Sequence, residues 1–364
     1  MRIMKPQISF VQSVMILMLS TGLMNHVIII PVLLDAADRD AWMSVIVAAA
    51  CSLAWIVILH LGISKIGKRP IFDIVSKAYH PLVGRLLAGA AAIYLFAICT
   101  ITTRDTVYWI HQTFSPETPI LVFALIFLFI SVVNAYLGIQ SIANTSSILL
   151  PIVILLGFFV MFSNTMHKDY SLLKPLLAYG MQPVWSGVIY VGAGFAEVIM
   201  LFFMHHHIKT RLSYLSFMII ILLLAGLTMG PLIGAITEFG TDEAAKLRFP
   251  AYEEWRLLTI GRYIEHLDFF SVYQWFSGAF IRISLSMFLI LDVFRIQSKK
   301  GKAWMLSCLY AVITFISTMP ISDQAFLRIM TNYLLPISLW GVLAFSVIMA
   351  GLLLLAQRRG KAAS

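Results

Sequence analysis

Apolar residues run along this chain in long blocks separated by polar stretches. A helix needs about 20 consecutive apolar residues to cross the hydrocarbon core of a bilayer. Ten blocks reach that length: 8–33, 42–64, 86–110, 119–137, 142–163, 185–206, 213–237, 268–294, 303–320 and 331–356. Two of the stretches between them are long, 164–184 and 238–267, and the charged, amphipathic second one predicts short helices on the surface. The pattern predicts an all-α membrane protein with about ten transmembrane helices in one integral membrane domain, 1–364.

Composition supports the membrane assignment. Of the 364 residues, 60% are hydrophobic and 12% are charged, whereas a soluble domain has about 25% charged residues. One soluble core could not bury so much apolar side chain. The first block follows Arg2 and Lys5 as in a secretory signal, but it is too long and contains Asn25, His26 and Pro31. We therefore interpret it as the first span.

The basic residues indicate how the chain is oriented. The net charge of +9 arises from 26 Lys and Arg against 17 Asp and Glu. With the N-terminus in the cytoplasm, the inner loops contain 16 of the basic residues and the outer loops 8. Cytoplasmic loops of membrane proteins are enriched in Lys and Arg. We expect both termini in the cytoplasm, an even number of spans, lipid as the surrounding partner, and no binding of nucleic acid.

The ten blocks divide into two halves of similar length, about 8–163 and about 185–356. Five spans in each half would give the halves opposite orientations, which is the inverted-repeat arrangement of many secondary transporters. The first helix of each half carries glycine and polar residues near mid-membrane, in 20–26 (STGLMNH) and 190–197 (YVGAGFAE). Broken backbone there must line a cavity, and half-helix ends suit charged ligand groups. Close packing of helices on the glycines is the alternative, and the sequence leaves both open.

Several ionisable residues fall inside the predicted spans. Glu197 lies near the middle of span six and Arg282 near the middle of span eight, while Arg104 and Asp105 lie toward the outer end of span three. A buried charge is costly and needs a partner or a cavity. We expect Glu197 and Arg282 to pair, either as a structural link or as part of a ligand site. Asp292 is expected to reach the basic loop that follows span eight.

Three consecutive histidines, 205–207, end span six. Helical neighbours point about 100° apart and metal-binding pairs prefer i, i+4 spacing, so we expect an interfacial cluster, no metal site and no cofactor. His26 follows the polar stretch of span one and is expected to line the cavity or cap a half-helix. The sequence contains no P-loop, G-x-S-x-G, H-E-x-x-H or C-x-x-C motif, so nothing in it indicates an enzyme.

Several segments together resemble a known family. They are 8–12 (ISFVQ), 68–74 (KRPIFDI), 194–198 (GFAEV), 248–252 (RFPAY), 260–268 (IGRYIEHLD), 273–276 (YQWF) and 280–284 (FIRIS). In order and spacing they are similar to the GerAB-type spore germination permeases, the B subunits of nutrient germinant receptors in endospore-forming bacteria. The similarity covers essentially the whole chain, and 248–284 is its most specific part.

The resemblance implies a fold and a function. The family is thought to share the fold of the amino acid–polyamine–organocation transporters, a LeuT-like 5+5 inverted repeat with broken helices one and six. It implies a ligand site between spans one, three, six and eight, an amino acid or similar small nutrient as ligand, A-type and C-type receptor subunits as partners, and a location in the spore inner membrane or the cell membrane. A secondary amino acid transporter coupled to H⁺ or Na⁺, or a water or ion conduit, remains the alternative.

The candidate ligand site is a hypothesis that combines these features. Unwound backbone offers N–H donors to a carboxylate, and small residues let the ligand approach the backbone. We expect Glu197 one helical turn below the break, where it contacts the ligand's ammonium or pairs with Arg282. The candidate residues are Thr21, Gly22 and His26 in span one, Tyr94 and Ile98 in span three, Gly192, Gly194 and Glu197 in span six, and Ser277, Ile281 and Arg282 in span eight.

Overall fold

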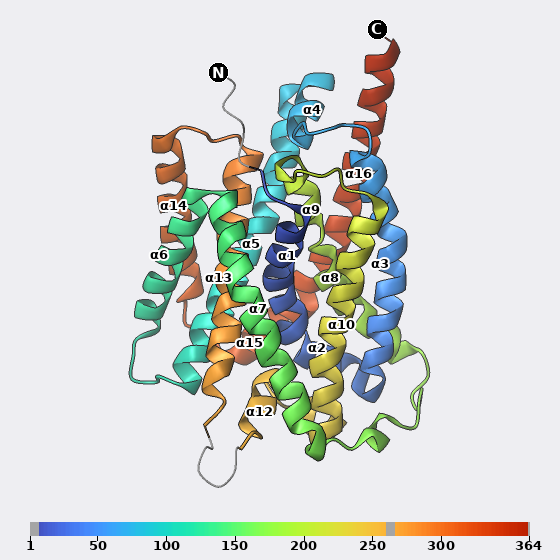
Figure 1. Ribbon diagram of the computed structural model, residues 1–364, viewed down its shortest axis with the longest axis vertical. Coiled ribbons are helices and arrows are strands. Elements are labelled where there is room, and N and C mark those ends of the chain that lie inside the picture. Colours follow the sequence, from blue (N-terminus) through green and yellow to red (C-terminus); the bar gives the residue numbers. More distant parts are fainter. Residues whose placement is uncertain (1–6, 260–265, 363–364) are drawn as a thin grey trace.

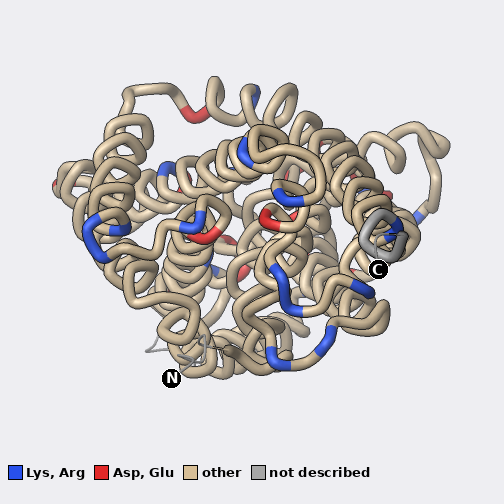
Figure 2. The backbone as a smooth tube through the Cα atoms, turned by 90° about the horizontal axis from the view of Figure 1, so that it is seen from above, with Lys and Arg blue, Asp and Glu red and all other residues tan. Residues whose placement is uncertain are grey.

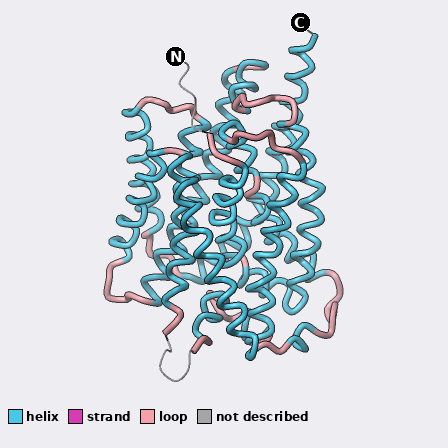
Figure 3. Tube along the Cα trace, in the orientation of Figure 1, coloured by secondary structure: helices cyan, strands magenta, loops and turns pink. Residues whose placement is uncertain are grey.

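A computed structural model describes residues 7–259 and 266–362. The chain forms one bundle of long helices with its loops at the two ends (Figures 1 and 3). The helices are α1 Phe10–Leu23, α2 Ile30–Ala37, α3 Ala41–Ile63, α4 Ile71–Ala78, α5 Pro81–Thr113, α6 Ile120–Leu137, α7 Ile139–Ser163, α8 Gln182–Ala196, α9 Ile199–Met204, α10 Tyr214–Phe239, α11 Thr241–Ala244, α12 Pro250–Arg256, α13 Phe269–Val293, α14 Lys299–Ser317, α15 Asp323–Ile329 and α16 Leu335–Ala362. The predicted all-α membrane fold is confirmed.

Nine helical segments in the described part of the chain are long and apolar enough to cross a membrane. They account for nine of the ten predicted spans. The remaining prediction, 303–320, falls largely on α14, which has 19 residues and packs against α5 and α6. Three lysines in its first turn, Lys299, Lys300 and Lys302, lower its hydropathy, and it is not among the nine. The expected short helices of the 238–267 stretch are α11 and α12, while 260–265 and the start of the chain with Arg2 and Lys5 lie outside the described residues.

The start of α1 and the end of α16 lie at the same end of the bundle (Figure 1). The same end carries α4 and α9, and α12 lies at the opposite end. Figure 2 views the molecule from the end with the two termini and shows blue Lys and Arg positions along its loops. The two ends of the described chain thus lie at one end of the bundle, and the even number of membrane crossings stays a prediction.

The centre of the bundle is formed by α8, α9 and α13. Every residue from 191 to 208 is buried, and so is nearly all of 277–291. Around them, α13 packs against α1, α5, α6 and α7, and α8 packs against α2, α3 and α16. By contrast, α7 exposes large apolar side chains such as Ile148 and Leu155, 68% and 69% exposed, which fits a lipid-facing helix. Polar residues of the central helices therefore meet inside protein.

Both predicted helix interruptions exist, but the predicted positions were a few residues too early. Span one continues as regular α-helix to Leu23, so Thr21 and Gly22 are helical, and a π-helical turn follows at Met24–Ile28. Its widened ring is closed by the bond from the Ile29 amide to the Met24 carbonyl, 3.1 Å. A π-turn inserts one extra residue without leaving the backbone unpaired, so the helix bends where full unwinding was expected.

Span six is interrupted by a turn that is tighter than an α-helix, whereas the turn in span one is wider. Gly192 and Gly194 lie inside α8, which ends at Ala196, and α9 begins at Ile199. The Glu197 amide bonds to the Gly194 carbonyl at 3.3 Å and the Val198 amide to the Phe195 carbonyl at 3.1 Å. These are the tighter three-residue bonds of a 3-10 turn. Glu197 is therefore at the interruption itself, and the prediction that it lies one turn below was wrong.

Candidate functional site

The expected ion pair between Glu197 and Arg282 is present at the centre of the bundle. Both guanidinium nitrogens face the carboxylate: Nη2 donates to Oε1 at 2.5 Å and Nη1 donates to Oε2. Only 3% of Glu197 and 2% of Arg282 is exposed. A two-pronged contact of this kind is the strongest geometry available to an arginine and a carboxylate. The pair fixes the turn between α8 and α9 to the middle of α13.

The other donors of the Arg282 guanidinium reach two further helices. Its Nε donates to Thr102 Oγ1 at 2.8 Å, and its Nη1 also donates to the Ser20 carbonyl at 3.0 Å. Thr102 is on α5 and Ser20 is on α1, and both are fully buried. One side chain thus connects spans one, three, six and eight, which are the four spans predicted to surround the ligand. Thr102 lies four residues after Ile98 and shares its helix face, so helical spacing could have identified it.

Asn25 lies between the π-turn of span one and Gly194 of span six, and it was not among the predicted site residues. It is the second residue of the π-turn, is fully buried, and donates from Nδ2 to the Thr21 carbonyl at 2.9 Å. A Cβ atom at Gly194 would lie only 2.4 Å from Asn25 Oδ1. Gly194 is therefore needed for close contact between span six and the Asn25 amide. The sequence contained a signal for Asn25, because it is a polar residue that follows Gly22 in the predicted break.

The other candidate glycines also accommodate side chains from neighbouring helices. A Cβ atom at Gly22 would lie 2.8 Å from Leu227 Cδ2, and one at Gly192 would lie 3.3 Å from Leu339 Cδ1. His26 belongs to the π-turn, where its Nδ1 is 3.2 Å from the Leu227 carbonyl oxygen. In this conformation the small residues of both spans are covered by protein. A ligand at these positions would have to displace Asn25, Leu227 or Leu339.

The four predicted wall residues lie on α5 and α13 as expected. Ile98, Ser277 and Ile281 are buried. Tyr94 is half-buried. Of these four, Ile281 directly precedes Arg282 in α13, and Ile98 lies one turn before Thr102 in α5. Their contact with a ligand stays a prediction.

An aromatic cluster closes the bundle at the end opposite the termini. Trp109 of α5 stacks on Trp275 of α13 with 4.1 Å between ring centroids, and Phe249 meets Trp275 edge-on at 5.2 Å. Beside it, Arg248 binds Asp105 at 2.5 Å. The 248–252 segment therefore covers this end of the central helices. Asp105, which was predicted only as an intramembrane charge, binds Arg248 and so holds the 248–252 segment in place.

The same end contains a buried carboxyl group on α12. Glu254 is 5% exposed, and its carboxylate lies against Gly234 of α10, where a Cβ atom would be 2.7 Å from Oε1. Burial raises the pKa of Glu254 well above its usual range, and the nearby charge of Glu238 raises it further. Glu238 is itself 3.5 Å from Lys168. Glu254 therefore holds its proton more readily than an exposed carboxyl group, which lowers the cost of packing α12 on α10.

The opposite end of the bundle corrects the expectation for Asp292. Asp292 does not reach the basic loop after α13; its Oδ2 lies 3.0 Å from His206 Nε2 and 3.2 Å from His207 Nε2. Two of the three consecutive histidines, His206 and His207, approach a common point, and His205 does not join them. They occupy a 3-10 turn, His205–His207, and both side chains extend toward the same carboxylate on α13.

Taken together, these features define a multi-span α-helical membrane protein whose central helices are joined by a buried charge pair. Residues 7–326 match the spore permease family, described as spore germination protein, and the chain belongs to that family. Spore germination protein XB of Bacillus anthracis is 42% identical over 342 residues, covering 94% of this chain and 96% of that protein. Spore germination protein KB of Bacillus subtilis (strain 168) is 24% identical over 266 residues, covering 69% of each. The family resemblance found in the sequence is confirmed.

Proposed function

We propose that this chain is the germinant-sensing membrane subunit of a spore nutrient receptor. In this proposal it binds an amino acid or similar small nutrient between spans one, three, six and eight, and binding triggers germination. The observation that carries the proposal is the Glu197–Arg282 pair, which lies at the interruption of span six and contacts spans one and three. An amino acid presents a carboxylate and an ammonium, the two charges that this pair complements.

The charge pair also defines how a ligand would act on the protein. Arg282 already occupies both oxygens of Glu197, so an ammonium reaching Glu197 must compete with Arg282, and a carboxylate reaching Arg282 must compete with Glu197. A zwitterion can replace both partners at once without leaving a buried charge unpaired. Binding would then separate α13 from the α8–α9 turn, which provides a conformational signal.

The pattern of helix packing supports the 5+5 inverted repeat, which we propose for 8–163 and 185–356. If each span is replaced by the corresponding span of the other half, three observed helix contacts become three other observed contacts. The contact of α1 with α7 corresponds to that of α8 with α16, and the contact of α1 with α10 corresponds to that of α8 with α3. The contact of α6 with α13 corresponds to that of α14 with α5. Such pairing is expected when two repeats of opposite orientation interlock around a central site. The A-type and C-type receptor subunits are the proposed partners, in the spore inner membrane or the cell membrane.

The proposed orientation predicts opposite accessibility for two exposed positions. With both termini in the cytoplasm, Glu243→Cys should react only with a reagent added outside, and Lys300→Cys only after the reagent gains access to the inside. Both residues are exposed at opposite ends of the bundle. The exposed Cys51 and Cys308 are first replaced by Ser. Labelling of both positions from the same side would contradict the arrangement.

Transport assays distinguish the receptor from the two alternatives. We expect the purified chain in proteoliposomes to show no saturable, ion-dependent uptake of labelled amino acids and no increase in water or ion flux. We also expect that spores lacking the A-type and C-type partners lose both the chain and the response to germinant. Saturable uptake driven by H⁺ or Na⁺ would instead establish a transporter, and normal germination without the partners would exclude the receptor role.

A further inference from the structure

A cluster of three metal-binding side chains lies at the end of the central helices nearest the termini. The Oδ2 atom of Asp292 is 3.0 Å from His206 Nε2 and 3.2 Å from His207 Nε2. One ligand atom from each residue lies within 4.8 Å of the other two. The side chains are 3%, 10% and 15% exposed for His206, His207 and Asp292. The proposed germinant site uses none of them.

Both Nε2 atoms lie at ion-pair distance from the same carboxylate oxygen, and the Nδ1 atoms of both rings are buried without a hydrogen-bond partner. Ligand atoms around a tetrahedral Zn²⁺ at about 2.0–2.1 Å are separated by roughly 3.3 Å, close to the observed spacings. Two imidazoles and one carboxylate suit Zn²⁺ and neighbouring transition metals, whereas Mg²⁺ and Ca²⁺ prefer oxygen ligands alone.

Neighbouring residues hold the histidine turn in place and keep a nearby arginine away from the Asp292 carboxylate. The His207 carbonyl accepts from the Ile8 amide at 2.9 Å, and the Lys209 amide donates to the Ile8 carbonyl at 2.8 Å, so the N-terminal segment fixes the histidine turn. The basic residue that follows α13, Arg295, is paired with Asp73 at 3.0 Å. Because Arg295 is bound to Asp73 and the histidine turn is held in place, the Asp292 carboxylate remains paired with His206 and His207.

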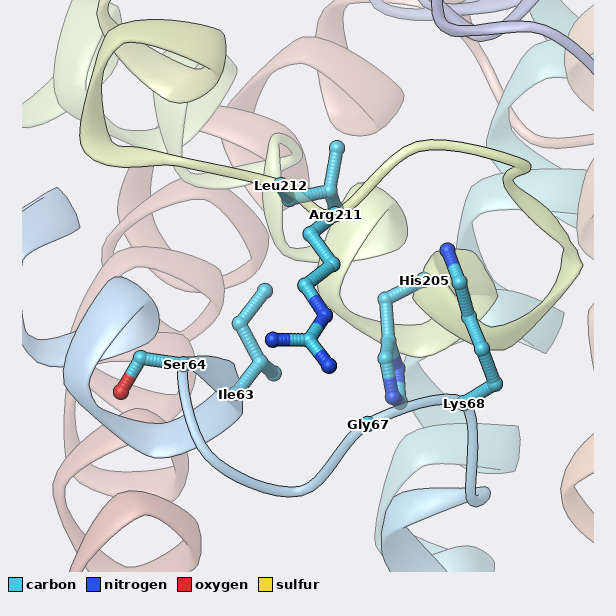
Figure 4. A pocket seen from close by; sticks show the side chains of 7 residues that line it. All are labelled: Ile63, Ser64, Gly67, Lys68, His205, Arg211 and Leu212. Carbon is cyan, nitrogen blue, oxygen red and sulfur yellow. The ribbon is translucent and has the colours of Figure 1, made fainter.

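The third histidine faces a different environment. His205 lines a small cavity of about 20 Å³ together with Lys68 and Arg211. Figure 4 shows these two basic side chains on either side of the His205 ring. A cation is disfavoured between two positive charges, so His205 does not belong with the other two. It provides a matched control, because it is adjacent in sequence, buried, and chemically identical.

We propose that His206, His207 and Asp292 form a binding site for one divalent transition-metal ion, with Zn²⁺ best suited to the ligands and water completing the coordination. The ion would join the end of α9 to the end of α13. The Glu197–Arg282 pair joins the same two spans about ten residues earlier in each, or roughly 15 Å along the helix axes. The metal would thus be a second link between the same two spans and would hold the ends of α9 and α13 together.

Metal binding by the full-length chain tests the proposal. The protein is purified in detergent with an affinity tag free of histidine, stripped with a chelator, and titrated with Zn²⁺ against a fluorescent competitor. We expect one ion per chain, a loss of at least about tenfold in affinity for His206→Ala, His207→Ala and Asp292→Asn, and unchanged affinity for His205→Ala. Equal binding by wild type and the His206→Ala/His207→Ala double variant would overturn the site and leave a cluster of polar side chains only.

A second measurement on the wild-type chain covers the case in which the variants fail to fold. Zn²⁺ in excess should raise the midpoint of thermal unfolding, because an ion that binds only the folded state stabilises it. Co²⁺ should give the visible absorption of a tetrahedral nitrogen and oxygen site. Absence of both effects would overturn the proposal. Neither readout involves a germinant, so the metal site and the germinant site can fail independently.

Discussion

Arg282→Met is expected to remove most of the folded protein from the membrane. The substitution keeps much of the side-chain volume but leaves Glu197 buried without its partner, and it deprives Thr102 and the Ser20 carbonyl of their donor. Removing one member of a buried ion pair costs about 3–5 kcal/mol, which is a large part of the stability of an ordinary protein. Protein level in isolated membranes and thermal unfolding in detergent measure the effect.

An exposed pair and a double substitution serve as controls. Arg256→Met breaks the surface pair with Glu253, 2.9 Å long, and exposed pairs contribute about 0–1 kcal/mol, so the protein level should be unchanged. The double variant Glu197→Leu/Arg282→Met removes both buried charges and should restore much of the level, while the response to germinant stays lost. If Arg282→Met alone accumulated and unfolded like wild type, the pair would not be a structural link.

Much of the fold could be predicted because the bilayer imposes simple requirements on the sequence. Nine of the ten long apolar blocks fall on helices that are long and apolar enough to cross a membrane, and the start of α1 and the end of α16 lie at the same end of the bundle, as expected for cytoplasmic termini on one side. The cost of intramembrane charge pointed to Glu197 and Arg282 as partners, and they are paired. Glycine-rich stretches marked the interrupted spans one and six, but not the π-turn at Met330–Leu334 in the last span. These signals can be read from sequence because each lies within one helix or reflects the large cost of placing a charge in the membrane.

The errors concern details that depend on contacts between helices. Whether a helix unwinds, widens into a π-turn or tightens into a 3-10 turn depends on what packs against it, so the breaks at Met24–Ile28 and Glu197–Val198 could not be placed by composition. Glycine pointed to the right region for a different reason, because Gly194 makes room for Asn25. The partners of Asp292 also come from another span, and no spacing within one helix reveals them.

Gly194→Val is expected to make the spores much less sensitive to germinant. The new Cβ atom would lie 2.4 Å from Asn25 Oδ1, so the Asn25 amide must leave the position in which it connects the π-turn of span one to span six. The added methyl groups would block the positions that the ligand is proposed to occupy when it displaces Asn25. We expect the germinant concentration for half-maximal germination to rise by more than about tenfold, which corresponds to about 1.4 kcal/mol of binding free energy.

Two further variants separate loss of the site from a general loss of packing. Gly230→Val introduces the same side chain in α10, where nothing lies within 4 Å of the new Cβ atom, and should leave the response unchanged. Asn25→Ala combined with Gly194→Ala removes the obstructing amide, so protein level and partner assembly should match wild type even if sensitivity does not recover fully. Dose–response curves of spores, with the amount of the chain measured by immunoblot, compare the variants at equal protein level. If Gly194→Val left the germinant concentration dependence unchanged, the contact between Asn25 and Gly194 would be packing alone, and the ligand would have to bind elsewhere in the chain or its partners.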